Sequence, residues 1–402
     1  MNLASLYQWN NLRNHVQREI LMSDRAEHVI IGGGIAGCSL AYFLVKKGIR
    51  DVILLEQEFL ASKETGLCPG GIRQQHTNEI CARLAKKSVD EFFTRINEEL
   101  QPEYPFSFLQ TGYMFLAHSH KTFQGFEKNV KQQNKWGIPS EIIKPEEISK
   151  FVPGINRDGL FGAAFCQTDG FLEDSHGVTQ LLGKRVRDLG GKVLFEEAVD
   201  IMTERGRITG VKTNKRVIET ESVINAAGCN SPVISSWVGV TLPLEIQKRR
   251  LLYTSRMEER FLEPLVVALD KGWAGKQLSE GNVYLGYLRE ADETISDHQF
   301  KEKCVEIAIH MLPKSMTKLR VQRLQEGCYD MTPDGQPIVG EVDTLKGYYL
   351  MTGFSGHGFM LAPALGMVLS DYLTGKQPSI DIDGLSLKRF HDADIDVDKL
   401  II

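Results

Sequence analysis

Three glycines and one carboxylate near the start of the chain have the spacing of a phosphate-binding turn. Gly32-x-Gly34-x-x-Gly37 follows the apolar run Val29–Ile31, and Glu56 ends the next apolar run. Glycines at these positions let a pyrophosphate approach the backbone N–H groups at a helix N-terminus. A carboxylate about 20 residues further on is placed to accept hydrogen bonds from an adenosine ribose. Together these residues predict dinucleotide binding.

The segments that must position this turn read as a β–α–β unit. Val29–Ile31 and Asp51–Leu55 have the apolar character of buried strands, and Cys38–Lys47 between them has helical character. Two parallel strands with a crossover helix bring the turn and Glu56 to one edge of a sheet. The alternative is an ordinary glycine-rich turn without a ligand, but the order of strand, glycines, helix and acid favours the dinucleotide site.

Three further stretches are rich in glycine and small residues, as is typical of backbone that passes close to a flat ligand. They are Ala61–His76, Val223–Gly228 and Gly353–Pro363. The third joins an apolar strand to a run of small and apolar residues after Pro363 that we expect to be helical. A second anion- or carbonyl-binding turn is therefore expected far from the first in sequence.

Other patterns divide the chain into regions of different fold class. Helices are expected over Asn78–Leu100 and Asp174–Leu189, and Phe106–Ala117 reads as two strands paired around Thr111-Gly112. Between Thr241 and Arg323, short apolar runs with polar breaks predict a largely antiparallel sheet, whereas the flanking regions have α/β character.

Composition excludes several classes of protein. The chain has 402 residues, 42% hydrophobic and 25% charged, with a formal net charge of −5. This length favours two lobes. The negative net charge does not indicate the basic surface that binding to nucleic acid requires. No apolar run approaches the roughly 18–20 residues of a membrane span. We recognise no secretory signal and expect a cytoplasmic location.

Seven cysteines are scattered without a C-x-x-C pair, so neither a disulfide framework nor a metal site is expected. Residues 1–24 carry apolar side chains at steps of three and four, which predicts an amphipathic extension helix. A helix of this kind could lie on a membrane surface, but docking on its own domain or on a partner subunit is the favoured interpretation.

Four of these pieces together resemble a known family. The fingerprint, Gly70–Gln75, Asn225–Gly228 and Gly353–Met360 are similar to the FAD-dependent amine oxidoreductases of the D-amino-acid oxidase superfamily. Within it, the greatest likeness is to the β subunits of heterotetrameric L-proline dehydrogenase and sarcosine oxidase. The resemblance covers nearly everything after about Asp24. It implies that FAD accepts a hydride at N5 from the carbon next to nitrogen in a small, often N-substituted amino acid, giving an imine.

The resemblance also implies a division into domains. We expect an α/β Rossmann-like FAD-binding domain that is discontinuous, and an α+β substrate domain with a mainly antiparallel sheet. The FAD-binding domain is expected at residues 25–104, 168–241 and 330–402, and the substrate domain at residues 105–167 and 242–329, after the extension at 1–24.

The cofactor-binding residues implied by the motifs lie in the four glycine-rich stretches and at the end of the second strand. They are Gly32, Gly34, Ile35, Ala36, Gly37, Glu56, Gln57, Ser62, Gly70, Gly71, Ile72, Ala227, Gly228, Gly356, His357, Gly358, Phe359 and Met360.

Arg73, Tyr284 and His357 are the candidate catalytic residues. Arg73 matches an arginine that pairs with the substrate carboxylate in sarcosine oxidases. Its planar guanidinium can donate two parallel hydrogen bonds to a carboxylate, which suits that role. The alternative is an arginine paired to the flavin or to a structural acid. His357 either donates to the flavin or caps its turn.

Two departures from the family bear on the electron acceptor. Met360 stands where monomeric sarcosine oxidases have a carboxylate-holding lysine, and Tyr284 or a neighbour stands where they have the lysine that promotes reaction with oxygen. A dehydrogenase that passes electrons to another carrier, with a partner subunit conceivable, is therefore favoured over an oxidase that makes hydrogen peroxide. The remaining alternative is a flavin-holding subunit or assembly factor that turns over no amine.

Two further residues concern how flavin is held. Cys328 lies one residue away from the position of covalent FAD attachment in monomeric sarcosine oxidases, and a shift of one residue in a strand turns a side chain to the other face. Noncovalent FAD is therefore expected. His176 falls near a histidine that carries FMN in heterotetrameric sarcosine oxidase, but FMN is not expected here, because relatives without FMN also have histidines nearby.

Overall fold

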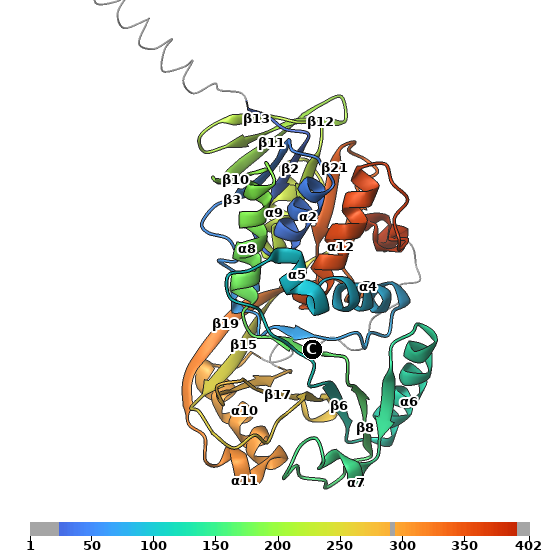
Figure 1. Ribbon diagram of the computed structural model, residues 1–402, viewed down its shortest axis with the longest axis vertical. Helices are drawn as coiled ribbons and strands as arrows, with labels where there is room; N and C mark the ends of the chain where they lie inside the picture. The colour runs from blue at the N-terminus through green and yellow to red at the C-terminus, as the bar shows by residue number, and fades with distance from the viewer. Residues whose placement is uncertain (1–23, 290–293, 392–402) are drawn as a thin grey trace, which may run out of the picture.

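The computed structural model describes residues 24–289 and 294–391, and the predicted helix in the N-terminal extension lies outside them. Figure 1 shows two lobes, one above the other, with the β11–β13 strands at the top and helices α7 and α11 at the bottom. The division into discontinuous domains by residue number stays a prediction.

A six-stranded sheet forms the centre of the upper lobe. Its order is β10-β3-β2-β14-β21-β20, and its inner strands are parallel while β20 and β21 pair antiparallel. The strands are β2 (His28–Ile31), β3 (Val52–Glu56), β10 (Lys192–Phe195), β14 (Val223–Asn225), β20 (Ile338–Glu341) and β21 (Tyr348–Thr352). Because β2, β14 and β21 run the same way side by side, the glycine-rich turns that follow them meet at one edge.

Helices cover one face of this sheet, where their apolar side chains form a single buried cluster with those of the strands. They are α2 (Ile35–Lys46), α4 (Glu79–Glu91), α5 (Ile96–Leu100), α8 (Ser175–Asp188) and α12 (Gly358–Leu373). The β–α–β prediction is confirmed, with α2 beginning three residues earlier than expected. Helix α12 also begins earlier and contains Pro363.

A second cluster lies on the other face of the central sheet. It is shared with a four-stranded sheet of order β1-β13-β12-β11 and with α9 (Ser231–Ser236). The strands are β1 (Asp24–Arg25), β11 (Ala198–Glu204), β12 (Arg207–Thr213) and β13 (Val217–Glu219).

The lower lobe is built on an eight-stranded sheet of order β19-β15-β18-β17-β16-β6-β8-β7. Among these described strands β16 and β6 pair parallel, and the other neighbours pair antiparallel. The strands are β6 (Tyr113–Ala117), β7 (Ser140–Ile143), β8 (Gly162–Cys166), β15 (Glu245–Thr254), β16 (Leu265–Ala268), β17 (Trp273–Gln277), β18 (Val283–Tyr287) and β19 (Val321–Met331).

Helices also pack on this sheet. Helices α7 (Pro145–Ile148), α10 (Asp297–Met311) and α11 (Pro313–Met316) contribute to one cluster, and α6 (His120–Lys135) contributes to another. The sequence pattern between Thr241 and Arg323 predicted only strands, so α10 is an element that it missed. No helix in the described part of the chain is long and apolar enough to cross a membrane.

One local prediction is wrong. The strands expected to pair around Thr111-Gly112 belong to different sheets: β5 (Phe108–Leu109) pairs with β9 (Gly170–Leu172), whereas β6 pairs with β8 and β16. Strand β9 also pairs with β4 (Gly71–Ile72), giving a three-stranded sheet. The helical segment expected over Asn78–Leu100 is confirmed, and it consists of α4, a short 3₁₀ turn at Phe93–Arg95, and α5.

Candidate functional site

A cavity of about 570 Å³ runs from the glycine turn of the upper lobe to the sheet of the lower lobe. At one end it is lined by Gly32–Ala36 and Glu56, which come from the β–α–β unit. At the other end it is lined by residues of β15, β18 and β19, including Arg249, Leu251 and Gly286. Its size lies within the range of small-molecule sites in proteins.

Close packing explains two glycines of the fingerprint. Gly32 has a φ of +117°, and a Cβ there would lie 2.4 Å from the carbonyl oxygen of Ala226 in the neighbouring turn. A Cβ at Gly37 would lie 2.0 Å from the carbonyl oxygen of Gly32. The sheet edge and the start of α2 are therefore in contact through backbone alone, as the role of these glycines predicts.

Glu56 lies directly beside this turn. One carboxylate oxygen accepts a hydrogen bond from the backbone N–H of Gly33 at 2.9 Å, and the other accepts one from the N–H of Glu58 at 2.8 Å. These bonds fix the carboxylate at the end of β3, where it lines the cavity. This is the placement that recognition of a ribose requires.

An extended dinucleotide fits these features. The wall formed by Gly32, Gly33 and Gly34 has no side chains, and a Cβ at Gly33 would lie 2.7 Å from the Glu56 carboxylate. Two long helices, α2 and α12, begin at the cavity, and neither has an acidic residue in its first turn. Their N-termini carry partial positive charge, which favours phosphate at one and a carbonyl or anionic ring edge at the other.

Buried carboxylates position the loops that reach the cavity. Asp169 is fully buried; it accepts hydrogen bonds from the backbone and side chain of Gln74 and from the side chain of Gln75, and burial raises its pKa to about 6. Asp330 accepts a hydrogen bond from the Gly353 N–H at 2.7 Å, and burial raises its pKa to about 6 as well. Neither carboxylate was predicted as a site residue, because burial and hydrogen-bond partners depend on tertiary contacts.

Arg73 and His357 form a buried pair at the cavity wall. Arg73 is fully buried, and its guanidinium donates to the Gln75 carbonyl and, at 2.8 Å, to Nε2 of His357. Because guanidinium has no acceptor, Nε2 must accept, so the imidazole is neutral with its proton on Nδ1. The ring of His76 lies edge-on at 5.0 Å between centroids. The role expected for Arg73 in binding the substrate carboxylate stays a prediction.

Arg249 is a second arginine at the cavity. It is half-buried; its guanidinium donates to the Gln247 side-chain oxygen at 2.9 Å and stacks on the ring of Tyr329 at 5.1 Å. Among the described residues no carboxylate lies within ion-pair distance of it, whereas neighbouring Arg250 pairs with Asp297 at 2.8 Å.

Tyr284 does not line the cavity. Its ring packs edge-on to Tyr253 at 5.4 Å between centroids, and in the sheet it lies opposite Lys276 of β17. Lys276 is almost completely buried; its ammonium donates to the Pro69 carbonyl at 2.6 Å and lies 3.8 Å from the centre of the Phe171 ring. No sequence pattern singles out this lysine, because only sheet pairing brings it to the Pro69 loop.

Burial of Lys276 makes a testable prediction about pH. Burial lowers the pKa of its ammonium from the usual 10.5 to about 7. Between these values the unfolded chain binds a proton that the folded chain does not, so stability should rise as pH increases from 7 to 10. Denaturant unfolding at several pH values in this window should show that Lys276→Met loses this rise relative to wild type. The exposed Lys318, changed to Met, is the control, and parallel profiles for wild type and Lys276→Met would rule out the shift.

Most of the predicted cofactor-binding residues line the cavity. Gly37, Gly70 and Ile72 do not line it: Gly37 packs on Gly32, and the other two lie at the β4–β9 pairing. The predicted residues that do line it are Gly32, Gly34, Ile35, Ala36, Glu56, Gln57, Ser62, Gly71, Arg73, Ala227, Gly228, Gly356, His357, Gly358, Phe359 and Met360. His176 is exposed on α8, with its ring near Phe59.

Many known proteins are similar to this chain, and three of them are described here. The chain is 26% identical to mitochondrial sarcosine dehydrogenase from Homo sapiens over 384 residues, covering 91% of this chain and 41% of that protein. It is 30% identical to FAD-dependent oxidoreductase domain-containing protein 1 from Mus musculus over 420 residues, covering 92% and 86%. The crystal structure of L-proline dehydrogenase from P. horikoshii superposes with a TM-score of 0.86 at 30% identity, covering 93% of this chain and 100% of that one.

The chain thus spans less than half of the human sarcosine dehydrogenase. A family model described as FAD dependent oxidoreductase matches residues 27–372, which include the glycine turn, Glu56, Arg73, Arg249 and the start of α12. The protein belongs to this family of FAD-dependent oxidoreductases.

Proposed function

We propose that the protein oxidises the C–N bond of a small, often N-substituted amino acid, and that it acts as a dehydrogenase. FAD, when bound, supplies the hydride acceptor for this oxidation. The proposal is supported by the likeness to L-proline dehydrogenase and to sarcosine dehydrogenase. It rests most directly on one observation, the guanidinium of Arg249 at the wall of the cavity without an acidic partner in the described chain.

Arg249 is proposed to bind the substrate carboxylate. A guanidinium offers two parallel N–H donors to a carboxylate, and the pairing is strong where the site excludes water. The ring of Tyr329 beneath Arg249 and the Gln247 side chain restrict its orientation. Leu251 and Gly286, which line the same end of the cavity, leave an apolar space for the carbon skeleton.

Arg73 and His357 are proposed to order the opposite wall of the cavity. Arg73 holds the imidazole in one tautomer through the bond at 2.8 Å, which keeps it neutral. Next to it, the N-terminus of α12 presents the backbone of Gly358 and Phe359 to the cavity. The partial positive charge of this helix end stabilises negative charge that develops nearby during the reaction.

A carrier other than oxygen is the proposed electron acceptor. Met360 lines the cavity with an apolar side chain where monomeric sarcosine oxidases have a lysine. By the family resemblance, Tyr284 or a neighbour stands where they have the lysine that promotes reaction with oxygen, and Tyr284 packs on Tyr253 without lining the cavity. The nearby Lys276 is buried between the Pro69 carbonyl and the Phe171 ring and does not line the cavity.

Flavin absorbance under anaerobic conditions tests this function. L-proline, sarcosine, glycine and a set of D-amino acids would be added in turn to the FAD-loaded protein. We expect one of the amino acids to bleach the oxidised flavin, and we expect pyrrolidine, which is proline without its carboxylate, to fail. Admitting air should then restore the colour only slowly.

Fast recovery of colour in air would favour an oxidase. Equal bleaching by pyrrolidine and L-proline would contradict carboxylate recognition. If no amine bleaches a fully loaded flavin, the catalytic proposal fails.

A further inference from the structure

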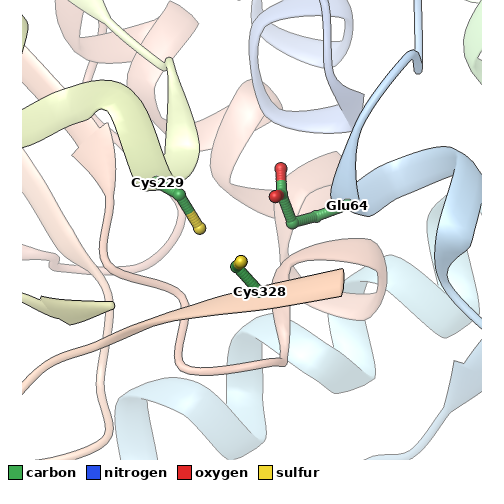
Figure 2. A group of neighbouring side chains, drawn as sticks. All are labelled: Glu64, Cys229 and Cys328. Atoms are coloured by element: carbon green, nitrogen blue, oxygen red, sulfur yellow. The ribbon is translucent and has the colours of Figure 1, made fainter. Parts of the chain in front are cut away.

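Two cysteines and a glutamate from distant parts of the chain meet at the edge of the cavity. Figure 2 shows Cys229, Cys328 and Glu64 with their side chains directed toward a common space. One ligand atom from each, two thiol sulfurs and a carboxylate oxygen, lie within 4.8 Å of one another. All three residues are half-buried and line the cavity.

Three separate elements bring these side chains together. Glu64 begins the short helix α3 (Glu64–Leu67), Cys229 lies in the 3₁₀ turn Gly228–Asn230 after β14, and Cys328 is in β19. The alternation of β19 decides which way Cys328 points. Gly327 faces the side chain of Leu67, and the next residue, Cys328, projects toward the 3₁₀ turn.

We propose that Glu64, Cys229 and Cys328 bind a thiophilic divalent metal ion of the zinc class. Thiolate sulfur and carboxylate oxygen are ligands that Zn²⁺ accepts, at about 2.3 Å and about 2.0–2.2 Å. Two sulfurs bound to one tetrahedral Zn²⁺ lie about 3.8 Å apart by this geometry, so small side-chain rotations complete the site. Three protein ligands leave the fourth position of a tetrahedral ion for a water molecule or another ligand.

The charge around the cluster is consistent with a bound cation. Glu64 supplies negative charge, and the neighbouring Glu326 is neutralised by Lys248, the residue opposite Cys328 in the sheet. Burial, with the nearby Glu64 carboxylate, raises the pKa values of both thiols, which therefore stay protonated until a metal replaces their protons. Metal binding at this site does not depend on the proposed amine oxidation.

Metal analysis of the FAD-loaded protein tests the site. After treatment with a reductant and a chelator, the protein would be dialysed against Zn²⁺ and its metal content measured. We expect about one Zn²⁺ per chain. A parallel sample with Co²⁺ should develop the thiolate charge-transfer and red-region bands of tetrahedral cobalt, beyond the absorbance of oxidised flavin.

Variants identify the ligands. The double change Cys229→Ser and Cys328→Ser should abolish binding and the cobalt bands, and Glu64→Gln should weaken binding at least tenfold. Cys304→Ala removes a buried thiol of α10 away from the cavity and should bind like wild type. Thermal unfolding should show that Zn²⁺ stabilises wild type and Cys304→Ala but not the double variant, a difference that does not require activity.

Three outcomes would overturn the proposal. One is the absence of bound metal in the reduced, folded protein, and another is binding that survives the double change. The third is a Cys229–Cys328 disulfide that persists after reductant treatment, detected by thiol counting and peptide mass, because the two sulfurs would then serve each other as partners.

Discussion

Gly37→Ala is expected to leave a protein that cannot retain FAD. The added Cβ would lie 2.0 Å from the carbonyl oxygen of Gly32, a backbone atom that cannot move without moving the phosphate turn. Overpacking of this kind costs about 1–3 kcal/mol of stability, and here the displaced atoms are those that approach the cofactor. The ratio of flavin to protein absorbance after dialysis should fall close to zero, and the unfolding temperature should drop.

The chain offers a matched control for the added methyl group. Gly125 is an exposed residue of α6, and a Cβ there meets nothing within 4 Å. Gly125→Ala should keep its FAD and gain about 0.5–1 kcal/mol, because glycine in a helix is less favourable than alanine. A Gly37→Ala protein that retains FAD as tightly as Gly125→Ala would contradict the packing account.

Arg249→Met is expected to lower kcat/KM for the amino-acid substrate by roughly 30- to 1,000-fold. Removing one partner of a desolvated charge pair costs about 2–4 kcal/mol, and each 1.4 kcal/mol is about tenfold. Methionine keeps most of the apolar stem, so FAD content and the oxidised flavin spectrum should not change. Anaerobic reduction at varied substrate concentration would give both constants.

Arg323→Met is the control for this change. Arg323 lies on β19, the strand that pairs with the Arg249 strand β15, and it also stacks on a tyrosine, with its guanidinium 4.7 Å from the centre of the Tyr253 ring, but it does not line the cavity. It should retain wild-type kcat/KM. If Arg249→Met turns over normally while Arg73→Met loses substrate reduction with FAD still bound, the carboxylate belongs to Arg73, as the family resemblance implied.

Local sequence was sufficient where the chemistry lies in one short segment. The glycine turn could be predicted because the turn, the helix start and Glu56 occupy fewer than 30 residues and each glycine has its own steric reason. The pairing expected around Gly112 failed for the opposite reason. The partners of β5 and β6 lie far along the chain, and alternation of apolar residues identifies a strand without identifying its neighbour.

Helix α10 was missed although a signal for it exists. Ser296 and Gln299 form a capping box at its N-terminus, and Phe300, Cys304 and Ala308 recur at four-residue steps along its buried face. The surrounding strand-like runs concealed this pattern. For Arg73 and Arg249 no sequence pattern could decide the roles, because burial and the identity of hydrogen-bond partners depend on tertiary contacts.

The paired strands β15 and β19 reach both walls of the cavity. They pair antiparallel from Glu245 opposite Met331 to Thr254 opposite Val321, and the ribbon they form carries Arg249. Asp330, near the end of the same ribbon, is bonded to the turn before α12 in the upper lobe. On its other side β15 pairs with β18, so this pair of strands is part of the eight-stranded sheet. The same pair of strands therefore contacts both walls of the cavity. A substrate that enters should find its binding groups already in place, with little conformational entropy lost in arranging them.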